Sequence, residues 1–205
     1  MAMSSTWVEA EFESIFRGHF IRLVRITRRV LRSDAEAEEV CSDTLLKLYR
    51  SGPGVLAGGP VGAWLYRAAT RAAIDRLRQA KRRGIEEEWE ADSGSEAGQG
   101  LEDPLNRMMR NERIAEVRST LARMKAEKAQ LLLLRHSGLR YDEIAAAMWI
   151  KASSVGTMLA RAEAEFSEQY ERRQRLENRT RQTRKANHPG DKSLSLGTPA
   201  KNPSE

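Results

Sequence analysis

The sequence predicts an all-α protein built from two small helical domains, and three observations support this fold class. Apolar residues recur at spacings of three and four along most of the chain, which is typical of amphipathic helices. Only 6% of the residues are aromatic and only six are prolines. A block rich in acidic residues, glycine and serine separates the two helical regions, and such a composition does not build a core.

The first domain is predicted over residues 7–83 and begins with a helix from about Trp7 to Leu31. Ser33 then has capping-box spacing to Glu36 and opens a second helix, residues 34–50. This helix has an apolar side that includes Cys41 and an exposed polar side. Residues 51–60 contain four glycines and two prolines, so they predict a loop.

A third helix is predicted over residues 60–83, PVGAWLYRAATRAAIDRLRQAKRR. Pro60 suits its first turn, where a missing N–H is no loss. Residues 67–83 carry seven basic side chains and a single acidic one, Asp75. Aromatic rings and guanidinium planes can stack on unpaired bases while cations hold phosphates, so this helix favours nucleic-acid binding.

The charge of the chain then changes from positive to negative, since residues 86–103 hold eight acidic side chains and no basic one. We therefore expect a flexible acidic linker over residues 84–104. A second domain follows at 105–170. It ends in two short helical segments, YDEIAAAM and ASSVGTMLARAEAEFSEQYE, which predict a helix-turn-helix. Residues 171–205 predict a basic, largely disordered tail; its segment 172–185 favours a solvated helix end over DNA or membrane contact.

Net charge, hydropathy and cysteine content limit the classes of function that the protein can have. The formal net charge of +6 favours a polyanionic partner such as nucleic acid or an anionic membrane surface. No apolar run approaches the roughly 18 residues of a membrane span, and the N-terminus lacks the pattern of a signal peptide. A single cysteine cannot form an internal disulfide, so a cytoplasmic location is expected. No metal-ligand spacing or phosphate-binding glycine motif is present, so we expect no enzyme, no metal, no cofactor and no small-molecule substrate.

Three stretches together resemble a bacterial RNA polymerase sigma factor of the extracytoplasmic-function type, within the sigma-70 family. They are DAEAEEVCSDTLLKLY at 34–49, the cationic helix at 60–83, and LLLLRHSGLRYDEIAAAMWIKASSVGTMLARAEAEF at 131–166. The resemblance implies a protein that binds core RNA polymerase and directs promoter-specific initiation. Members of this family are generally held inactive by an anti-sigma factor or another signal-dependent control, so an anti-sigma factor is a candidate partner.

The resemblance also assigns roles to residues. The −10 promoter element would be bound and melted by the third helix through Trp64, Tyr66, Arg67, Arg71, Asp75, Arg78 and Lys81. The −35 element would be bound by Lys151, Ser153, Ser154, Thr157 and Arg161. Core polymerase would be bound by Glu39, Ser42, Asp43 and Leu46. From the residues alone, core packing of Trp64 is as well supported as DNA contact.

The sequence departs from the family pattern at several of these places. Ser42 stands where relatives usually have glutamine, and Arg140 stands where a serine usually caps the helix, so Asp142 is a candidate replacement cap. Trp149 stands where the turn commonly has glycine, and a bulky residue at positive φ is strained.

Two other functional classes fit part of the sequence. A free-standing helix-turn-helix regulator would use only residues 105–170 and would bind its DNA unaided. An interaction protein would bind polymerase without starting transcription.

Overall fold

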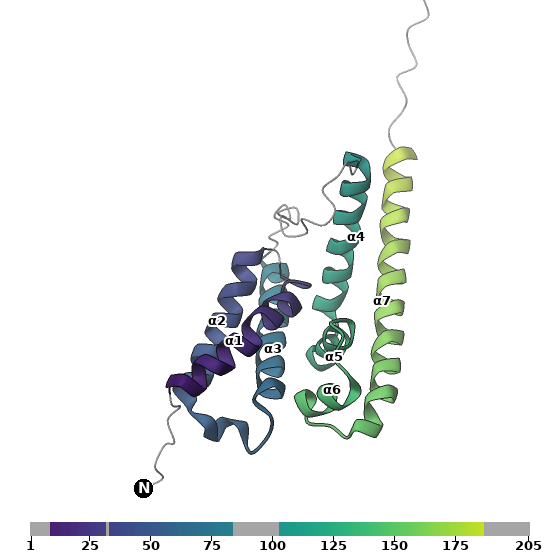
Figure 1. The fold of residues 1–205 in the computed structure, drawn as a ribbon. Helices are drawn as coiled ribbons and strands as arrows, with labels where there is room; N and C mark the ends of the chain where they lie inside the picture. The colour runs from purple at the N-terminus through teal and green to yellow at the C-terminus, as the bar shows by residue number, and fades with distance from the viewer. Residues whose placement is uncertain (1–8, 32, 84–102, 187–205) are drawn as a thin grey trace, which may run out of the picture. The chain divides into compact units, whose positions relative to one another are not determined.

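The computed structural model describes residues 9–31, 33–83 and 103–186, and every regular element in these ranges is a helix (Figure 1). The predicted all-α fold class is therefore confirmed. In chain order the elements are α1 (Glu9–Thr27), α2 (Asp34–Ser51), the 3-10 helix η1 (Pro53–Leu56), α3 (Val61–Arg82), α4 (Pro104–Arg123), α5 (Ala126–His136), α6 (Tyr141–Met148) and α7 (Ala152–Ala186).

Helix ends follow the local signals of the sequence. The Ser33 hydroxyl accepts a hydrogen bond from the Glu36 N–H at 3.1 Å, which caps α2 as predicted. Gly138 follows α5 with φ of +83°, in the left-handed region that glycine adopts without strain. The carboxylate of Asp103 accepts from the backbone N–H of Leu105 and caps α4. The predicted acidic linker falls mostly on residues 84–102, which lie outside the described ranges.

The core is formed by the apolar faces that the periodicity predicts. In α1–α3 it contains side chains such as Leu23, Leu45 and Leu65, each at most 1% exposed. In the helix-turn-helix region it contains the row Leu131, Leu132, Leu133 and Leu134 together with Ile144, Ala145, Val155, Leu159 and Ala162. All of these side chains are buried.

Contacts along the chain define two compact units, residues 1–170 and 171–205. Within the first unit, α3 packs against α1 and α2 on one side and also against α4, α5 and α6. The two predicted domains, 7–83 and 105–170, are therefore in contact with each other. Their sequences had given no indication of this contact, because each region can bury an apolar face within itself.

The C-terminal helix extends beyond the predicted domain boundary at residue 170. Residues 171–186 continue α7 as a helix, which agrees with the solvated helix end favoured for residues 172–185. Most of their side chains are exposed, and Arg175 pairs with Glu171 one turn earlier at 2.9 Å. Such i,i+4 pairs and residues of good helix propensity support a solvated helix without an apolar face. Residues 187–205 lie outside the described ranges.

Candidate nucleic-acid interface

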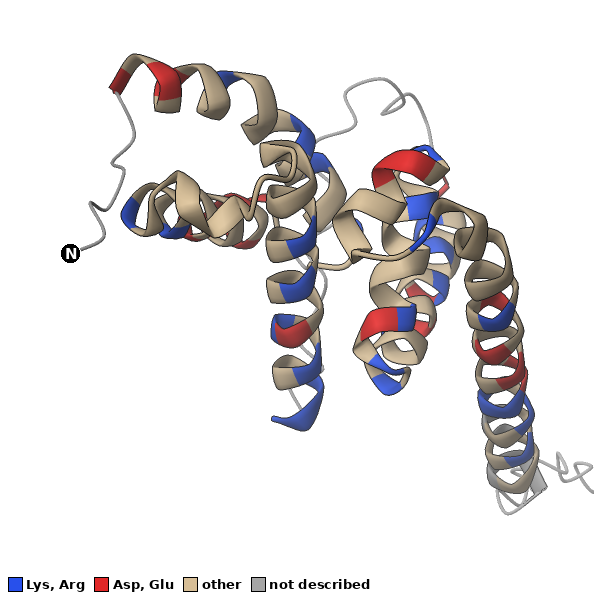
Figure 2. Cartoon of the chain, turned by 90° about the horizontal axis from the view of Figure 1, so that it is seen from below, with Lys and Arg blue, Asp and Glu red and all other residues tan. Residues whose placement is uncertain are grey.

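Helix α3 presents a row of four basic side chains, Arg67, Arg71, Arg78 and Lys81, which we call the α3 stripe. Their spacings of 4, 11 and 14 residues fall on one face of a helix that turns about 100° per residue. Lys and Arg recur along α3 while Asp and Glu are sparse, as Figure 2 shows. The local sequence therefore builds the aligned cationic surface that the nucleic-acid prediction requires.

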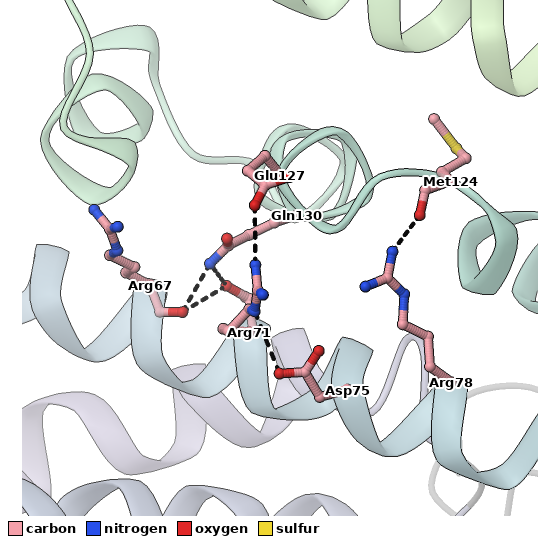
Figure 3. Close-up of polar contacts among 8 residues, drawn as sticks. Arg67, Arg71, Asp75, Arg78, Met124, Glu127 and Gln130 are labelled. Atoms are coloured by element: carbon pink, nitrogen blue, oxygen red, sulfur yellow. Dashed lines mark hydrogen bonds and ion pairs between the residues drawn. The ribbon is translucent and has the colours of Figure 1, made fainter.

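The α3 stripe lies on the side of α3 that is next to α4 and α5, and Figure 3 shows Arg71 and Arg78 directed toward them, although Arg71 and Lys81 remain exposed to solvent. Arg71 donates from Nη1 to Glu127 Oε1 at 3.2 Å and from Nε to Asp75 Oδ2 at 3.3 Å. Arg78 donates to the backbone carbonyl of Met124. Lys81 donates to the carbonyl and the hydroxyl of Ser119, at 2.9 and 3.0 Å. Three cations of the stripe thus have their donors directed at oxygen atoms of the second half of the chain.

Arg67 is engaged in a different way. Its guanidinium carbon lies 3.9 Å from the ring centroid of Trp149, within the range of a cation–π contact. Trp149 has φ of 57° and ψ of 45°, so this bulky residue adopts the left-handed conformation that favours glycine. Its side chain is 66% exposed. The contact with Arg67 partly offsets the strain of placing a bulky residue there.

The ion pair between Arg71 and Glu127 stabilises the charged form of both side chains. The backbone N–H of Glu127 and then the Arg71 guanidinium hold the pKa of the Glu127 carboxyl below its usual value. The hydrogen bond to Glu127 in turn raises the pKa of Arg71. Both side chains are therefore ionised at neutral pH. Relative to the Arg71 guanidinium, the Glu127 carboxylate lies where a phosphate group would bind.

The two aromatic residues of α3 differ in their exposure. Tyr66 is 5% exposed, and its ring packs with the Arg22 guanidinium at 5.0 Å, so its expected role in DNA contact does not agree with its position. The spacing of Tyr66 to Ala69 and Thr70, both buried, is the sequence signal that places it inside. Trp64 is half-buried and, with Trp149, lines a hollow of about 500 Å³.

The predicted polymerase-binding residues form one exposed face of α2. Glu39, Ser42, Asp43 and Leu46 are all exposed, with Leu46 at 43%, and their spacing of three and four places them together. Glu39 accepts a hydrogen bond from Arg76 of α3 at 2.6 Å, which lowers the pKa of the Glu39 carboxyl. An exposed apolar residue among acidic and polar neighbours suits a protein-docking surface.

The helix-turn-helix consists of α6, the turn at 149–151 and the first turns of α7. Lys151, Ser153, Thr157 and Arg161 are exposed, and Ser154 is half-buried, so all five predicted −35 residues lie at the start of α7 or in the turn before it. At the N-terminus of α6, Glu143 makes the hydrogen bond to the backbone of the cap residue in the absence of a capping serine. Glu143 accepts from the backbone N–H of Arg140 at 2.8 Å, whereas the Asp142 carboxylate accepts from the Arg140 side chain.

Sequence reasoning missed the residues that cover the α3 stripe. Gln130 donates from Nε2 to the Arg67 carbonyl and to the Thr70 hydroxyl, both at 2.7 Å, and it is 3% exposed. The only advance signal is that a polar residue, Gln130, directly precedes the apolar row Leu131–Leu134. A buried amide needs partners, but the sequence does not say which.

Other kinds of site are not found in the part of the chain that the structure describes. Among the described residues, no group of three or more His, Cys, Asp or Glu could hold a metal ion. None of the described helices combines the length and the apolar character that crossing a bilayer requires.

Comparison with known proteins relates this arrangement to one family. Residues 15–83 match the family model for sigma-70 region 2. SigM of Mycobacterium tuberculosis, an extracytoplasmic-function RNA polymerase sigma factor, is 33% identical over 70 residues, which are 34% of this chain and 36% of SigM. Residues 15–83 therefore resemble a sigma-70 region 2 domain. The chain's matched segment spans only about a third of the length of SigM.

Two further proteins extend the likeness beyond region 2. The RNA polymerase sigma-H factor of Pseudomonas aeruginosa is 26% identical over 147 residues, 69% of this chain and 76% of that factor. The solved structure of CnrH in complex with the cytosolic domain of CnrY covers 78% of this chain and 88% of its own, with a TM-score of 0.50. Its sequence identity is 19%, so it shows a shared fold. The family resemblance inferred from the sequence is thereby confirmed.

Proposed function

We propose that this protein is a sigma factor that binds core RNA polymerase and directs promoter-specific initiation. The observation that supports it most is the α3 stripe, four cations aligned on the helix that ends the matched sigma-70 region 2. In this proposal α3 binds the melted −10 strand, with the stripe on phosphates and Trp64 available for stacking on a base. Tyr66 is left out of the contact set because it is buried.

The proposal gives the other two surfaces matching roles. The exposed face of α2, which includes Asp43 and Leu46, docks on core polymerase. The start of α7 enters the major groove of the −35 element, where Lys151 and Arg161 hold phosphates and Ser153 and Thr157 reach base edges. The protein would act where core polymerase is, in the cytoplasm, without catalytic chemistry of its own. An anti-sigma factor is a further candidate partner, since CnrH was solved with the cytosolic domain of CnrY bound.

Run-off transcription with purified core polymerase and a library of genomic promoters tests the proposal. We expect promoter-specific transcripts only when both proteins are present. A free-standing regulator would instead shift its DNA without polymerase, and an interaction protein would bind polymerase without producing transcripts.

Two classes of variant separate the roles. Arg71→Ala is expected to lower open-complex formation about three- to ten-fold while binding of core polymerase stays unchanged, because one charge-assisted phosphate contact is lost. Asp43→Ala with Leu46→Ala is expected to weaken core binding first. Arg17→Ala, a change of an exposed arginine on α1, is the matched control. Equal losses of core binding and of melting in Arg71→Ala would contradict the division of roles.

A further inference from the structure

We propose that Glu39 acts within the chain: it holds Arg76 of α3 away from Asp43, so that core polymerase meets one available carboxylate on α2. The docking face is the exposed side of α2 formed by Glu39, Ser42, Asp43 and Leu46. The inference rests on the proposed function, because it takes the docking face as the polymerase-binding surface. It deepens that function by separating a carboxylate that contacts the partner from one that acts through another residue.

The two acidic residues of the docking face differ in their partners. Glu39 and Asp43 lie one helical turn apart and are both exposed. Oε2 of Glu39 accepts a hydrogen bond from Nη1 of Arg76 at 2.6 Å. Within the described ranges, the Asp43 carboxylate takes part in no ion pair. A partner therefore meets a carboxylate at Glu39 whose charge is already neutralised, and one at Asp43 whose charge is not.

Arg76 has more than one carboxylate near it. Its hydrogen bond to Glu39 raises the pKa of the guanidinium, and the charges of Glu36 and Asp43 add to this effect. Its side chain is 35% exposed, so part of it is free to move. An arginine in this position is expected to bind another carboxylate when its first partner is removed.

A hollow between α2 and α3 connects Arg76 to Asp43. It measures about 460 Å³, and its lining includes Asp43, Thr44, Ala72 and Arg76 but not Glu39. The hollow has room for a long side chain of a binding partner beside Asp43. Because Arg76 borders the same space, its guanidinium can turn across it to Asp43 once Glu39 no longer binds it.

The chemistry of the partner's surface follows from these charges. A cation brought next to Glu39 would meet the guanidinium of Arg76, and like charges at short distance repel each other. A cation beside Asp43 avoids this repulsion while Arg76 stays on Glu39. Leu46 lies three residues further on the same face and is 43% exposed. We therefore expect the polymerase surface to carry a Lys or Arg next to an apolar recess, and not two cations one helical turn apart.

Two substitutions separate a positioning role of Glu39 from direct contact. Glu39→Gln removes the charge that holds Arg76, so Arg76 turns to Asp43 and the affinity for core polymerase is expected to fall about two- to five-fold. Adding Arg76→Gln removes the competing cation and restores the net charge of the unmodified chain. The double variant is therefore expected to regain most of the affinity. If Glu39 contacted polymerase directly, the loss would persist in the double variant.

Asp43→Asn tests the same assignment from the other side. If Glu39→Gln acts by directing Arg76 to Asp43, it causes no further loss in a chain that already carries Asp43→Asn. Two independent polymerase contacts would instead give additive losses. Glu13→Gln with Arg17→Gln is the matched control, because it removes an exposed ion pair of α1 and keeps the net charge. This control is expected to leave the affinity unchanged.

The affinities are measured by fluorescence anisotropy, with the full-length chain labelled at its N-terminus and titrated with purified core polymerase. Urea unfolding of each variant checks its folding, and a loss that Arg76→Gln reverses is not a loss of folding. An unchanged affinity of Glu39→Gln, a double variant as weak as Glu39→Gln, or additive losses with Asp43→Asn overturns the inference. In these cases the unmodified chain still binds polymerase, so the sigma-factor function stands. If the unmodified chain does not bind polymerase, both proposals are overturned.

Discussion

The imidazole of His19 is half-buried between α1 and α3 and lies edge-on to the Tyr66 ring, with 6.1 Å between centroids. Burial, and then the nearby charge of Arg22, lower the pKa of His19 below its usual value. The folded protein therefore keeps this residue neutral under conditions in which the unfolded chain would begin to protonate it.

This lowered pKa predicts a loss of stability in mild acid. Between the lowered pKa and the ordinary value of 6.5, the unfolded chain binds more protons, so the free energy of unfolding falls as the pH falls through this window. Urea unfolding at about pH 7.5 and 5.5 measures it. We expect His19→Gln, which cannot take up the proton, to lose less stability on acidification than the unmodified chain. Parallel pH dependences of the two proteins would contradict the assignment.

Cys41 is the single cysteine and is 0% exposed, with its sulfur 3.4 Å from the hydroxyl of Thr27. Burial raises the pKa of the thiol, so the reactive thiolate is disfavoured as well as shielded. We predict that Ellman's reagent modifies the folded protein at least about a hundred-fold more slowly than the denatured chain, since reaction then requires opening of the core. Rapid modification under native conditions would show that the α1–α2 contact opens readily.

At the scale of the elements, the approach of α1 to α3 depends on a glycine. A Cβ added to Gly62 would lie 2.9 Å from Cε1 of His19, closer than ordinary packing permits. Gly62→Ala is therefore expected to displace the His19 ring and to destabilise the protein by about 1 kcal/mol or less, because the ring can move and alanine has the better helix propensity. Gly54→Ala is the matched control, because its Cβ would meet nothing within 4 Å. Denaturant unfolding of the three proteins checks this, and equal midpoints would contradict it.

The local features of the elements were predictable because their causes are local. The cap at Ser33, the left-handed Gly138 and the left-handed turn at Trp149 each depend on a few neighbouring residues. The burial of Tyr66 was not foreseen because an amphipathic aromatic residue fits both a core and a stacking surface. Its place was decided by the buried positions three and four residues later. The helical extension from 171 to 186 agrees with the solvated helix end that the composition of residues 172–185 favours.

At the scale of the whole molecule, what the sequence could not provide is which surfaces meet. Arg71 and Glu127 are 56 residues apart, and Gln130 and Arg67 are 63 apart. Helical periodicity says which side of each helix is polar, but a cation on such a side can face solvent, DNA or another helix equally well. The cations of α3 were identified from the sequence, whereas their present partners followed only from the packing of α3 against α4, α5 and α6.

The second compact unit gives a prediction about the molecule's contacts with DNA. Residues 171–186 are a largely exposed basic helix, and their ion pair between Glu171 and Arg175 is local. A chain that ends at residue 170 is therefore expected to keep its Tm within about 2 °C, because few packed side chains are removed. We also expect the salt dependence of promoter binding by the polymerase complex to stay unchanged, as for a solvated helix end.

The control for this truncation is Lys81→Ala, which removes a proposed phosphate contact of the α3 stripe. Each lost phosphate contact reduces the slope of log K against log salt by about 0.9. Lys81→Ala should therefore lower the magnitude of this slope by about 0.9, whereas the truncation should leave the slope unchanged. If truncation lowers this slope by the equivalent of several phosphate contacts, residues 171–205 bind the DNA backbone. Phosphate contacts release counterions and so change the slope without changing the sequence preference.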